Sequence, residues 1–385
     1  MIERWRAICQ LGIALVWWTL LLANLGGADA SFGSCAATEP GAGVAWWPEV
    51  PPPGPQTENS NELTRLRARR RIVVLPDVHG DADAMLALLD ATEVARSDPD
   101  GRVSWRGADA VLVQLGDVLD RGDEEFRALD ILWDLKAQAR ECGGEVHLLL
   151  GNHEVMNLMG DFRYVAPGAW AQTFNLTNKM ALDDVSERVK QRAQSIQHPL
   201  VQRRAQALLA GGSISRRIFA YSKVALIIGS HLFVHAGVIP QTIPGGVESL
   251  HALNVRTQSF VRGNGAEDAD MDFALSNLAG PDAVVWTRRY GMPMGSALSA
   301  AQCSDLRRVL KETHTSTMFI GHTIQFSGIN GACHGAAWRM DTGMSKFYGG
   351  VREAIEILDG EISIISLAAG EGTPMKVQIK QRLLD

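Results

Sequence analysis

Three short polar motifs, each following an apolar segment, carry the residues of this sequence that are most capable of chemistry. The motifs are Asp77–Gly80 (DVHG), Gly116–Gly122 (GDVLDRG) and Gly151–Glu154 (GNHE). Carboxylates, imidazoles and amide oxygens are ligands for divalent metal ions, and an arginine beside them can bind phosphate oxygens in a fork geometry. The motifs supply this set in the order Asp77, His79, Asp117, Asp120, Arg121, Asn152 and His153. They therefore indicate a metal-dependent phosphoesterase.

Further along the chain, two more histidines and one arginine also follow apolar segments. His235 begins the sequence HAG, His322 lies within GHT, and Arg288 ends the sequence WTR. The set contains no cysteine, so metals that favour thiolate ligands are disfavoured, whereas manganese, iron and zinc are all compatible. The cofactor that we expect is therefore a pair of divalent metal ions.

Two metal ions that share a carboxylate can do the chemistry of phosphate ester hydrolysis. A bridging carboxylate holds the ions about 3.5–4 Å apart. The pair lowers the pKa of a shared water, so that hydroxide is available near neutral pH, and it offsets the charge that develops on the phosphate. A histidine oriented by an acidic residue can protonate the leaving oxygen. The residue types alone leave open which histidine is that acid and which histidines are ligands.

The elements that must position these residues are strands and helices in alternation. Apolar segments at 72–75, 110–115 and 145–150 precede the motifs and are predicted to be buried strands, and residues 83–95 and 124–142 between them have helical spacing. This alternation predicts a mostly parallel sheet, and open α/β folds place their chemistry at the carboxyl ends of such strands. Further strands are predicted at 224–228, 232–234, 284–288, 318–320, 336–340, 354–358, 362–367 and 375–379.

The domain organisation follows from changes in composition along the chain. Residues 155–217 are polar and lack a strong strand pattern, with one or two helices predicted at 185–209, so we expect a helical insertion that covers the site. It lies within a predicted catalytic domain of residues 71–385. Residues 31–70 are rich in proline and glycine and end in a run of arginines, which predicts a linker. The arginine run has three interpretations: a solvated helix face, a patch for anionic membranes, or a dibasic processing site.

The first residues of the chain have the pattern of a targeting segment. Arginines precede an apolar stretch from Leu11 to Leu25, and Ala28 and Ala30 occupy the two positions that signal peptidase recognises. Residues 1–30 are therefore predicted to be a signal peptide that directs the protein to the secretory pathway, either the endoplasmic reticulum lumen or the outside of the cell. One alternative is an uncleaved signal anchor, in which residues 7–25 hold the protein on a membrane. The other is a bipartite leader for a plastid.

Composition excludes some classes of function. The chain has 385 residues, of which 46% are hydrophobic, enough for one large domain or two of ordinary size. A formal net charge of -6 implies no general affinity for nucleic acid. The five cysteines form no CxxC pair, so a zinc finger is not expected. Beyond the leader, the cysteines are either paired in an oxidising compartment or free and buried.

The order DxHG, GDxxDRG, GNHE, HAG, GHT resembles the phosphoprotein phosphatases of the calcineurin-like metallophosphoesterase superfamily. The resemblance covers roughly residues 72–367. Longer strings are similar to one branch, the Shewanella-like protein phosphatases: NHEVMN from Asn152, GDFRYV from Gly160, WTR from Trp286 and WRMDTGMS from Trp338. The fold that this resemblance implies is of the α/β class, with two packed mixed β-sheets flanked by α-helices.

The resemblance also implies a role for each candidate residue. It assigns Asp77 and His79 to the first metal ion, Asp117 to a bridging position, and three ligands to the second ion: Asn152, His235 and His322. It assigns two arginines to the substrate phosphate, Arg121 and Arg288, and it makes His153 a general acid held by Asp120. Asn152 and His153 are adjacent. If they lie on an extended turn, their side chains point different ways, so only one of them easily faces a given ion.

Three candidate functions are compatible with these motifs. The first is a phosphomonoester hydrolase that acts on phosphoproteins, at phosphoserine, phosphothreonine or phosphotyrosine. The second is a hydrolase of dinucleoside polyphosphates or other small-molecule phosphates, because the related diadenosine tetraphosphate hydrolases share most of these motifs. The third is a phosphate-binding pseudoenzyme, which is disfavoured because every metal and acid position is retained.

The leader generates a direct prediction. If residues 1–30 are a cleaved signal peptide, N-terminal sequencing of the protein isolated from its native cells will find Ser31 as the first residue. A chain that still begins at Met1 would contradict cleavage and would leave the signal anchor as the explanation of the apolar stretch.

Overall fold

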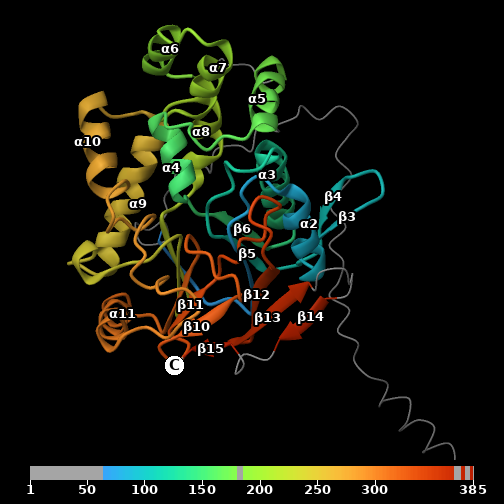
Figure 1. Ribbon diagram of the computed structural model, residues 1–385, viewed down its shortest axis with the longest axis vertical. Helices are drawn as coiled ribbons and strands as arrows, with labels where there is room; N and C mark the ends of the chain where they lie inside the picture. The colour runs from blue at the N-terminus through green and yellow to red at the C-terminus, as the bar shows by residue number, and fades with distance from the viewer. Residues whose placement is uncertain (1–63, 180–184, 368–373, 378–381, 385) are drawn as a thin grey trace, which may run out of the picture. The chain divides into compact units, whose positions relative to one another are not determined.

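Two mixed β-sheets pack face to face at the centre of the fold (Figure 1). The computed structural model of the protein describes residues 64–179, 185–367, 374–377 and 382–384, all within one compact unit. The strand order is β14-β13-β12-β2-β5-β6 in the six-stranded sheet and β1-β7-β8-β9-β11-β10-β15 in the seven-stranded sheet, with a separate ribbon β3-β4. The predicted architecture of two packed mixed sheets is confirmed.

The strand bounds agree closely with most of the predicted strands. The six-stranded sheet contains β2 (Arg71–Leu75), β5 (Val111–Gln114), β6 (Glu145–Leu148), β12 (Arg352–Leu358), β13 (Glu361–Leu367) and β14 (Pro374–Val377). The seven-stranded sheet contains β1 (Arg65–Leu66), β7 (Ala225–Ile228), β8 (His231–Val234), β9 (Thr317–Ile320), β10 (Asn330–Ala332), β11 (Ala337–Arg339) and β15 (Leu383–Leu384). The ribbon contains β3 (Ala95–Ser97) and β4 (Val103–Trp105). The sequence pattern does not predict strands β1, β3, β4, β10 and β15.

Helices cover the outer faces of the two sheets. The helices that follow predicted spacing are α2 (Ala82–Ala91) and α3 (Glu125–Glu141). The region of the predicted insertion contains α4 (Asn152–Met159), α5 (Pro167–Lys179), α6 (Glu187–Gln194), α7 (Pro199–Leu208) and α8 (Ser213–Arg217). The remaining helices are η2 (Phe219–Tyr221), η3 (Pro240–Thr242), α9 (Val247–Arg262), α10 (Glu267–Asn277) and α11 (Ala300–Glu312). The insertion is helical as predicted, and its helices gather at one end of the sheets (Figure 1).

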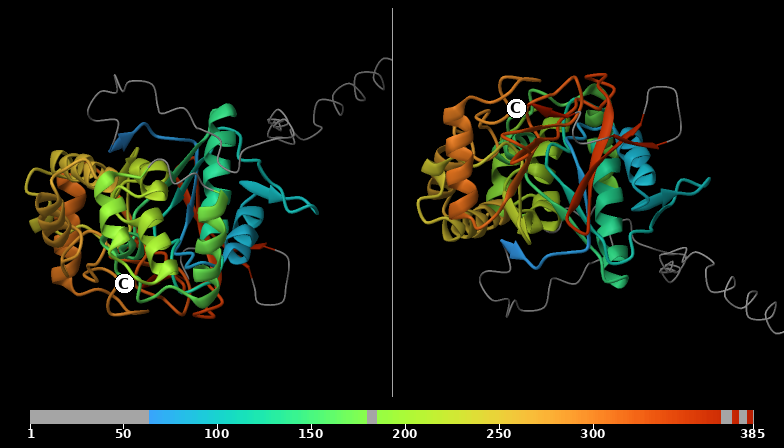
Figure 2. Two further views of the ribbon diagram at one scale, coloured as in Figure 1. Left: turned by 90° about the horizontal axis from the view of Figure 1, so that it is seen from above. Right: turned by 90° about the horizontal axis from the view of Figure 1, so that it is seen from below.

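The layers form because alternate side chains of a strand point to opposite faces. Ile72 and Val74 of β2 lie in the core between the sheets, together with Phe319 of β9. Val73 and Leu75 point the other way, into the core that α2 and α3 cover. Figure 2 shows the strands between two groups of helices, with α2 and α3 on one side and α9 and α11 on the other. Both faces of β2 are therefore buried, which explains its continuous apolar sequence.

The register of the strands brings the polar motifs to one edge. Strands β2, β5 and β6 are parallel, with Leu75 opposite Gln114 and Gln114 opposite Leu148. The three motifs therefore begin just beyond the same edge of the six-stranded sheet. In the other sheet, β8 and β9 are also parallel, with Phe233 opposite Phe319. This places the segments that contain His235 and His322 at the corresponding edge of their own sheet.

The predicted strand at 284–288 is wrong. The structure has turns at Val284–Trp286, although Val284 and Val285 are buried. The carbonyl oxygen of Val284 accepts N–H bonds from Ala236 and Gly237, at 3.0 and 3.2 Å, instead of joining a strand ladder. The apolar residues here reflect burial of a turn against the end of β8, which a sequence pattern does not distinguish from burial of a strand.

The arginine run belongs to the folded unit, so the predicted linker boundary at residue 70 and the helix interpretation are both wrong. Strand β1 pairs with β7 in parallel, and Arg65 donates to the carbonyl oxygens of Gly229 and Thr313. Arg69 and Arg71 form ion pairs with strand carboxylates. The predicted leader and the linker up to residue 63 lie outside the described residues. In the described part of the chain, no helix has the length and apolar character needed to cross a membrane.

A disulfide joins Cys303 of α11 to Cys333, which follows β10. The sequence alone leaves open whether the cysteines are paired or free. For these two cysteines the structure shows pairing, and the bond ties an outer helix to the seven-stranded sheet.

Candidate active site

The motif loops turn at residues with positive φ angles. The φ angle is 46° at His79, 54° at Asp117, 67° at Asp120, 70° at Arg121 and 66° at His322. Left-handed backbone at a non-glycine residue is uncommon and costs on the order of 1–3 kcal/mol. The loops after β2, β5 and β9 thus carry concentrated backbone strain, and they bring their side chains together at the shared edge of the sheets.

The carboxylate of Glu154 holds the loop after β5 in this shape. It accepts backbone N–H bonds from Gly151 at 2.8 Å, Asp117 at 2.7 Å, Val118 at 2.9 Å and Leu119 at 3.0 Å. Bonds from several N–H groups to one buried carboxylate offset part of the strain and link the loop to the first turn of α4. Reasoning from the sequence assigned no role to Glu154, although the GNHE motif contains it.

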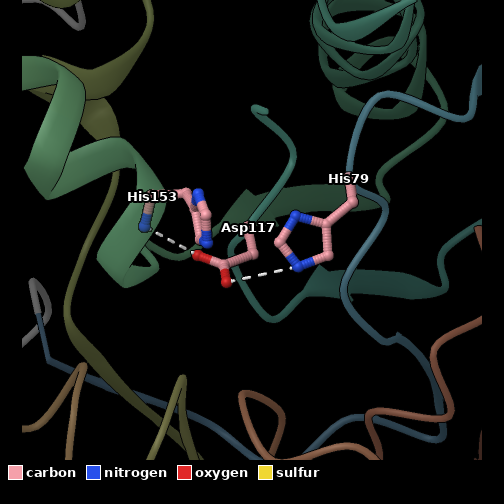
Figure 3. Close-up of side chains that lie close together, drawn as sticks. All are labelled: His79, Asp117 and His153. Carbon is pink, nitrogen blue, oxygen red and sulfur yellow. Dashed lines mark hydrogen bonds and ion pairs between the residues drawn. The ribbon is translucent and has the colours of Figure 1, made fainter. Parts of the chain in front are cut away.

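The carboxylate of Asp117 is at the centre of the site. Its Oδ2 atom lies 3.6 Å from Nε2 of His79 and 3.4 Å from Nε2 of His235. Its Oδ1 atom accepts the backbone N–H of His153 at 2.9 Å, and Figure 3 shows Asp117 between His79 and His153. Two groups of side chains that can hold a metal ion meet at Asp117: one also contains His79 and His153, and the other also contains His235 and His322.

Backbone carbonyl oxygens orient three of the histidines. Nδ1 of His79 lies 3.2 Å from the carbonyl oxygen of Leu119, and Nδ1 of His235 lies 2.9 Å from that of Leu115. Nε2 of His322 lies 3.0 Å from the carbonyl oxygen of Trp286. Because a carbonyl oxygen only accepts, each histidine donates an N–H there, and in the neutral ring the other nitrogen is an acceptor. This arrangement of a ring N–H on a carbonyl oxygen is typical of metal-binding histidines.

One buried acceptor atom lacks a donor among the described residues, and a second faces a ring nitrogen, which fits a cation site. Oδ1 of Asp77 has no hydrogen-bond partner among the described residues. Oδ1 of Asn152 lies 3.0 Å from Nε2 of His235, the acceptor nitrogen of that ring in its neutral form. Two acceptors at this distance repel each other unless a proton or a metal ion lies between them. The donor set of carboxylates, imidazoles and one amide therefore fits divalent metal ions.

The charges of the site lead to the same conclusion. Burial acts to lower the pKa of His235, but the carboxylates of Asp117 and Asp77 outweigh burial and raise that pKa to about 10. Burial lowers the pKa of His79 to about 4 and, with His235 and an arginine nearby, lowers that of His322 to about 3. The buried carboxylates thus attract positive charge, while His79 and His322 are neutral and available as ligands.

His153 faces the same cavity but has a different partner. Its Nδ1 atom lies 2.7 Å from Oδ2 of Asp120, a residue with no exposed surface. Burial acts to lower the pKa of His153, but Asp117 and Asp120 outweigh burial and raise it. Because Nδ1 donates to Asp120, Nε2 is the atom that can hold an exchangeable proton.

The expected extended turn at Asn152 and His153 is wrong. Both residues are in the first turn of α4, with Gly151 as the N-cap. Adjacent side chains on a helix are about 100° apart, so the two side chains still diverge. Asn152 lies beside His235, whereas His153 lies beside Asp120.

Both predicted phosphate-binding arginines line the cavity, which has a volume of about 290 Å³. The guanidinium carbon of Arg121 lies 3.9 Å from the ring centre of Tyr164, and its Nε atom has no partner among the described residues. NH1 of Arg288 donates to the carbonyl oxygen of His322 at 3.2 Å and to the hydroxyl of Thr323 at 3.0 Å. The free N–H groups of both side chains are thus available to a ligand.

The structure brings all ten predicted site residues together. Seven line the cavity: His79, Asp117, Arg121, Asn152, His153, Arg288 and His322. Three are buried directly behind it: Asp77, Asp120 and His235. The cavity wall also contains Tyr164 and Asp341, to which reasoning from the sequence assigned no role.

Comparisons with known proteins agree with this geometry. A model of the family "Calcineurin-like phosphoesterase" matches residues 70–325. Shewanella-like protein phosphatase 2 of Arabidopsis thaliana is 33% identical over 327 residues, which cover 80% of each chain. The chain is a calcineurin-like phosphoesterase of the Shewanella-like protein phosphatase branch. An uncharacterized protein of Schizosaccharomyces pombe is 30% identical, over 82% of this phosphoesterase and 86% of the relative.

Solved structures show the same fold. The crystal structure of a cold-active protein-tyrosine phosphatase of a psychrophilic Shewanella species has a TM-score of 0.61 to this phosphoesterase. Its sequence identity is 24%, and 82% of each chain is covered. The family match and the Arabidopsis relative identify the phosphoesterase as a hydrolase. Two divalent ions, when bound, would supply the positive charge that activates water and neutralises a phosphate.

The central position of Asp117 can be tested directly. The substitution Asp117→Asn keeps the shape of the side chain but removes its charge, so we expect turnover to be abolished and fewer than two metal ions to be bound per chain. Metal analysis of the purified protein measures the second effect independently of activity. Asp109→Asn, at the exposed opposite end of β5, is the matched control and should leave both quantities unchanged. An active Asp117→Asn protein with two ions per chain would contradict the prediction.

Proposed function

We propose that this phosphoesterase is a phosphoprotein phosphatase that uses two divalent metal ions. The observation that carries the proposal is the Asp117 carboxylate, which lies between His79 and His235 in a cavity that two arginines line. Carboxylate and imidazole ligands around a phosphate-sized cavity suit hydrolysis of a phosphate ester at a two-metal site.

The ligands divide into two groups that share Asp117. Asp77 and His79 would hold the first ion, Asp117 would be a ligand common to the two ions, and the second ion would take three further ligands: Asn152, His235 and His322. The unpartnered Oδ1 of Asp77 and the facing acceptors of Asn152 and His235 support this division. Manganese, iron and zinc all suit these oxygen and nitrogen donors.

The two arginines hold the phosphate of the substrate. Arg288 is oriented by its bonds to His322 and Thr323, so its position depends on the same loop as a metal ligand. Arg121 stacks on Tyr164, which leaves its N–H groups directed away from the ring face. The planar guanidinium groups bind phosphate oxygens in a fork geometry, so the two arginines orient the substrate within the cavity.

His153 donates the proton that the leaving oxygen requires. Its Nδ1–H stays on Asp120, and its Nε2 atom carries the proton that is transferred. The carboxylates of Asp117 and Asp120 raise the pKa of His153, which favours the protonated ring and supports this role. The acid and the phosphate-binding arginines line the same cavity, so one bound phosphomonoester can meet all of them.

An apolar rim around the cavity supports a polypeptide substrate. Met294, Phe326 and Phe347 are exposed by 46%, 61% and 56%, and Met294 and Phe326 line the cavity. Large exposed apolar side chains in one area mark interaction surfaces. Among the described residues that line the cavity, the arginines and lysines are Arg121 and Arg288. Two such side chains provide little positive charge for binding a polyphosphate. The rim therefore favours a phosphorylated peptide over a dinucleoside polyphosphate.

We also infer that the phosphatase works in an oxidising compartment, reached through the secretory route that the leader predicts. The disulfide between Cys303 and Cys333 supports this inference, because such bonds persist in oxidising compartments and are rare in the cytosol. Sequencing of the N-terminus of the native protein tests the route itself.

The dependence of turnover on the leaving group of the substrate distinguishes a proton donor from a metal ligand. With His153→Asn, we expect near-normal metal content and a loss of about 10²–10⁴-fold in turnover of alkyl phosphates, the usual contribution of a general acid. The loss should be smaller for p-nitrophenyl phosphate, whose leaving group barely needs a proton. An equal loss on both substrates, together with a missing metal ion, would make His153 a ligand instead.

The substrate class can be determined by assaying the enzyme with a panel of phosphopeptides and diadenosine tetraphosphate. The wild-type enzyme should hydrolyse phosphotyrosine or phosphothreonine peptides and leave diadenosine tetraphosphate intact; the opposite result would favour the small-molecule alternative.

The contribution of the apolar rim can be tested by substitution. In the double variant Met294→Ser with Phe326→Ser, KM for a peptide with apolar flanking residues should rise about tenfold, because a lost apolar contact of about 1.5 kcal/mol corresponds to that factor. Leu275→Ser, an equally exposed apolar site on α10, is the control.

A further inference from the structure

Arg204 is a buried arginine with no part in the metal site described above. It is on α7, within the helical insertion, and its side chain has no exposed surface. A charged group in such a place is strongly destabilising unless all of its donors are bonded. Its bonding partners therefore indicate what the insertion contributes to the enzyme.

The guanidinium group contacts polar residues from four other segments: α3, α4, α5 and the loop after β5. NH1 and NH2 pair with the carboxylate of Glu125, and NH1 lies 3.4 Å from the hydroxyl of Thr173. Nε and NH2 donate to Oδ1 of Asn157 at 3.0 and 2.8 Å. NH2 also lies 3.4 Å from Oδ1 of Asp120. Aromatic rings enclose the group, with centres 5.5–5.7 Å away in Phe126, Phe162 and Trp170.

Arg204 determines which way the amide of Asn157 points. An arginine only donates hydrogen bonds, so Asn157 must present its oxygen to Arg204 and its NH₂ group to the opposite side. On that side, Nδ2 of Asn157 lies 3.2 Å from both carboxylate oxygens of Asp120 and 2.9 Å from the carbonyl oxygen of His153. If the amide were reversed, its oxygen would face the carboxylate and be repelled.

Asp120 is therefore held from behind while it contacts His153 in front. Its backbone N–H donates to Glu125 at 2.9 Å, so the acid that pairs with Arg204 also positions the main chain of Asp120. Its Oδ2 atom remains directed at Nδ1 of His153, at 2.7 Å. The contacts form one chain from the insertion to the cavity: Arg204, Asn157, Asp120 and His153.

We propose that Arg204 is a positioning residue for proton transfer, through which the helical insertion holds the Asp120–His153 pair in the orientation that protonates the leaving group. The inference rests on the proposed function, in which His153 is the acid. It makes the insertion a part of the catalytic apparatus, beyond its role as a cover over the site.

The test compares two substrates that differ in their need for a proton. In Arg204→Met, turnover of an alkyl phosphate such as a phosphoserine peptide should fall at least tenfold, whereas turnover of p-nitrophenyl phosphate should change by less than about threefold. KM for both substrates and metal content should be unchanged, because Arg204 contacts neither the phosphate site nor a ligand. In Arg204→Lys, a single ammonium cannot replace the planar fork, so we expect a partial loss of the same kind.

A second variant decides the question if Arg204→Met does not fold. Asn157→Leu removes the amide that links Arg204 to Asp120 and leaves Arg204 paired with Glu125, and it should show the same selective loss on alkyl phosphates. Thr173→Val removes a long contact to the guanidinium and a bond to the carbonyl oxygen of Ala169 but leaves the contacts to Asn157 and Glu125, so it should leave the ratio of the two rates at the wild-type value. If a variant is only less well folded, its turnover of both substrates falls by the same factor. Circular dichroism detects such a loss of folded protein.

His153→Asn separates failure of this inference from failure of the proposed function. If His153→Asn shows the selective loss and both Arg204→Met and Asn157→Leu lower the two rates equally or not at all, Arg204 only stabilises the insertion and the inference is overturned. If His153→Asn itself loses both rates together with metal, the assignment of the acid is wrong. Selective loss in all three variants supports the chain from the insertion to the leaving group.

Discussion

Negative charge buried in a small volume is the constraint on which the rest of this structure depends. Asp77, Asp117 and Asp341 each expose only 2% of their surface, and a buried charge without a partner costs several kcal/mol. Burial, and then the neighbouring Asp341, raise the pKa of Asp77 well above its usual value. Cations relieve this repulsion, so metal affinity and the stability of the surrounding loops are two aspects of one free energy.

The side chains that could hold these cations are predictable because of the strands that precede them. A strand buried on both faces is an uninterrupted apolar run, and a polar residue just after such a run must lie at the edge of the sheet. For this reason the amino-acid pattern alone is enough to locate the candidate metal ligands that follow β2, β5, β8 and β9. The same reasoning fails at Val284, where an equally apolar run packs as a turn, because burial alone selects apolar residues whatever the backbone does.

The roles of Arg204 and Glu154 could not be predicted from the sequence pattern, for a different reason. Arg204 contacts Asp120, which lies 84 positions earlier in the chain, and periodicity along the sequence records only local structure. The neighbouring Arg203 has the same side chain but is partly exposed. In a polar helix, therefore, only the packing of the folded chain shows which arginine is enclosed. The same holds for Glu154, whose four partners are backbone N–H groups that carry no sequence signature.

The disulfide has a consequence for the second half of the metal site. Cys303 and Cys333 are separated by 30 positions, and the covalent loop that they close contains β9, His322 and Phe326. Closing a loop of this length restricts the unfolded chain, by about 3–4 kcal/mol in the chain-entropy account. Oxidative maturation would therefore favour folding of the segment that carries a candidate metal ligand and part of the apolar rim. A polypeptide made in a reducing cytosol would have to assemble that segment without the cross-link.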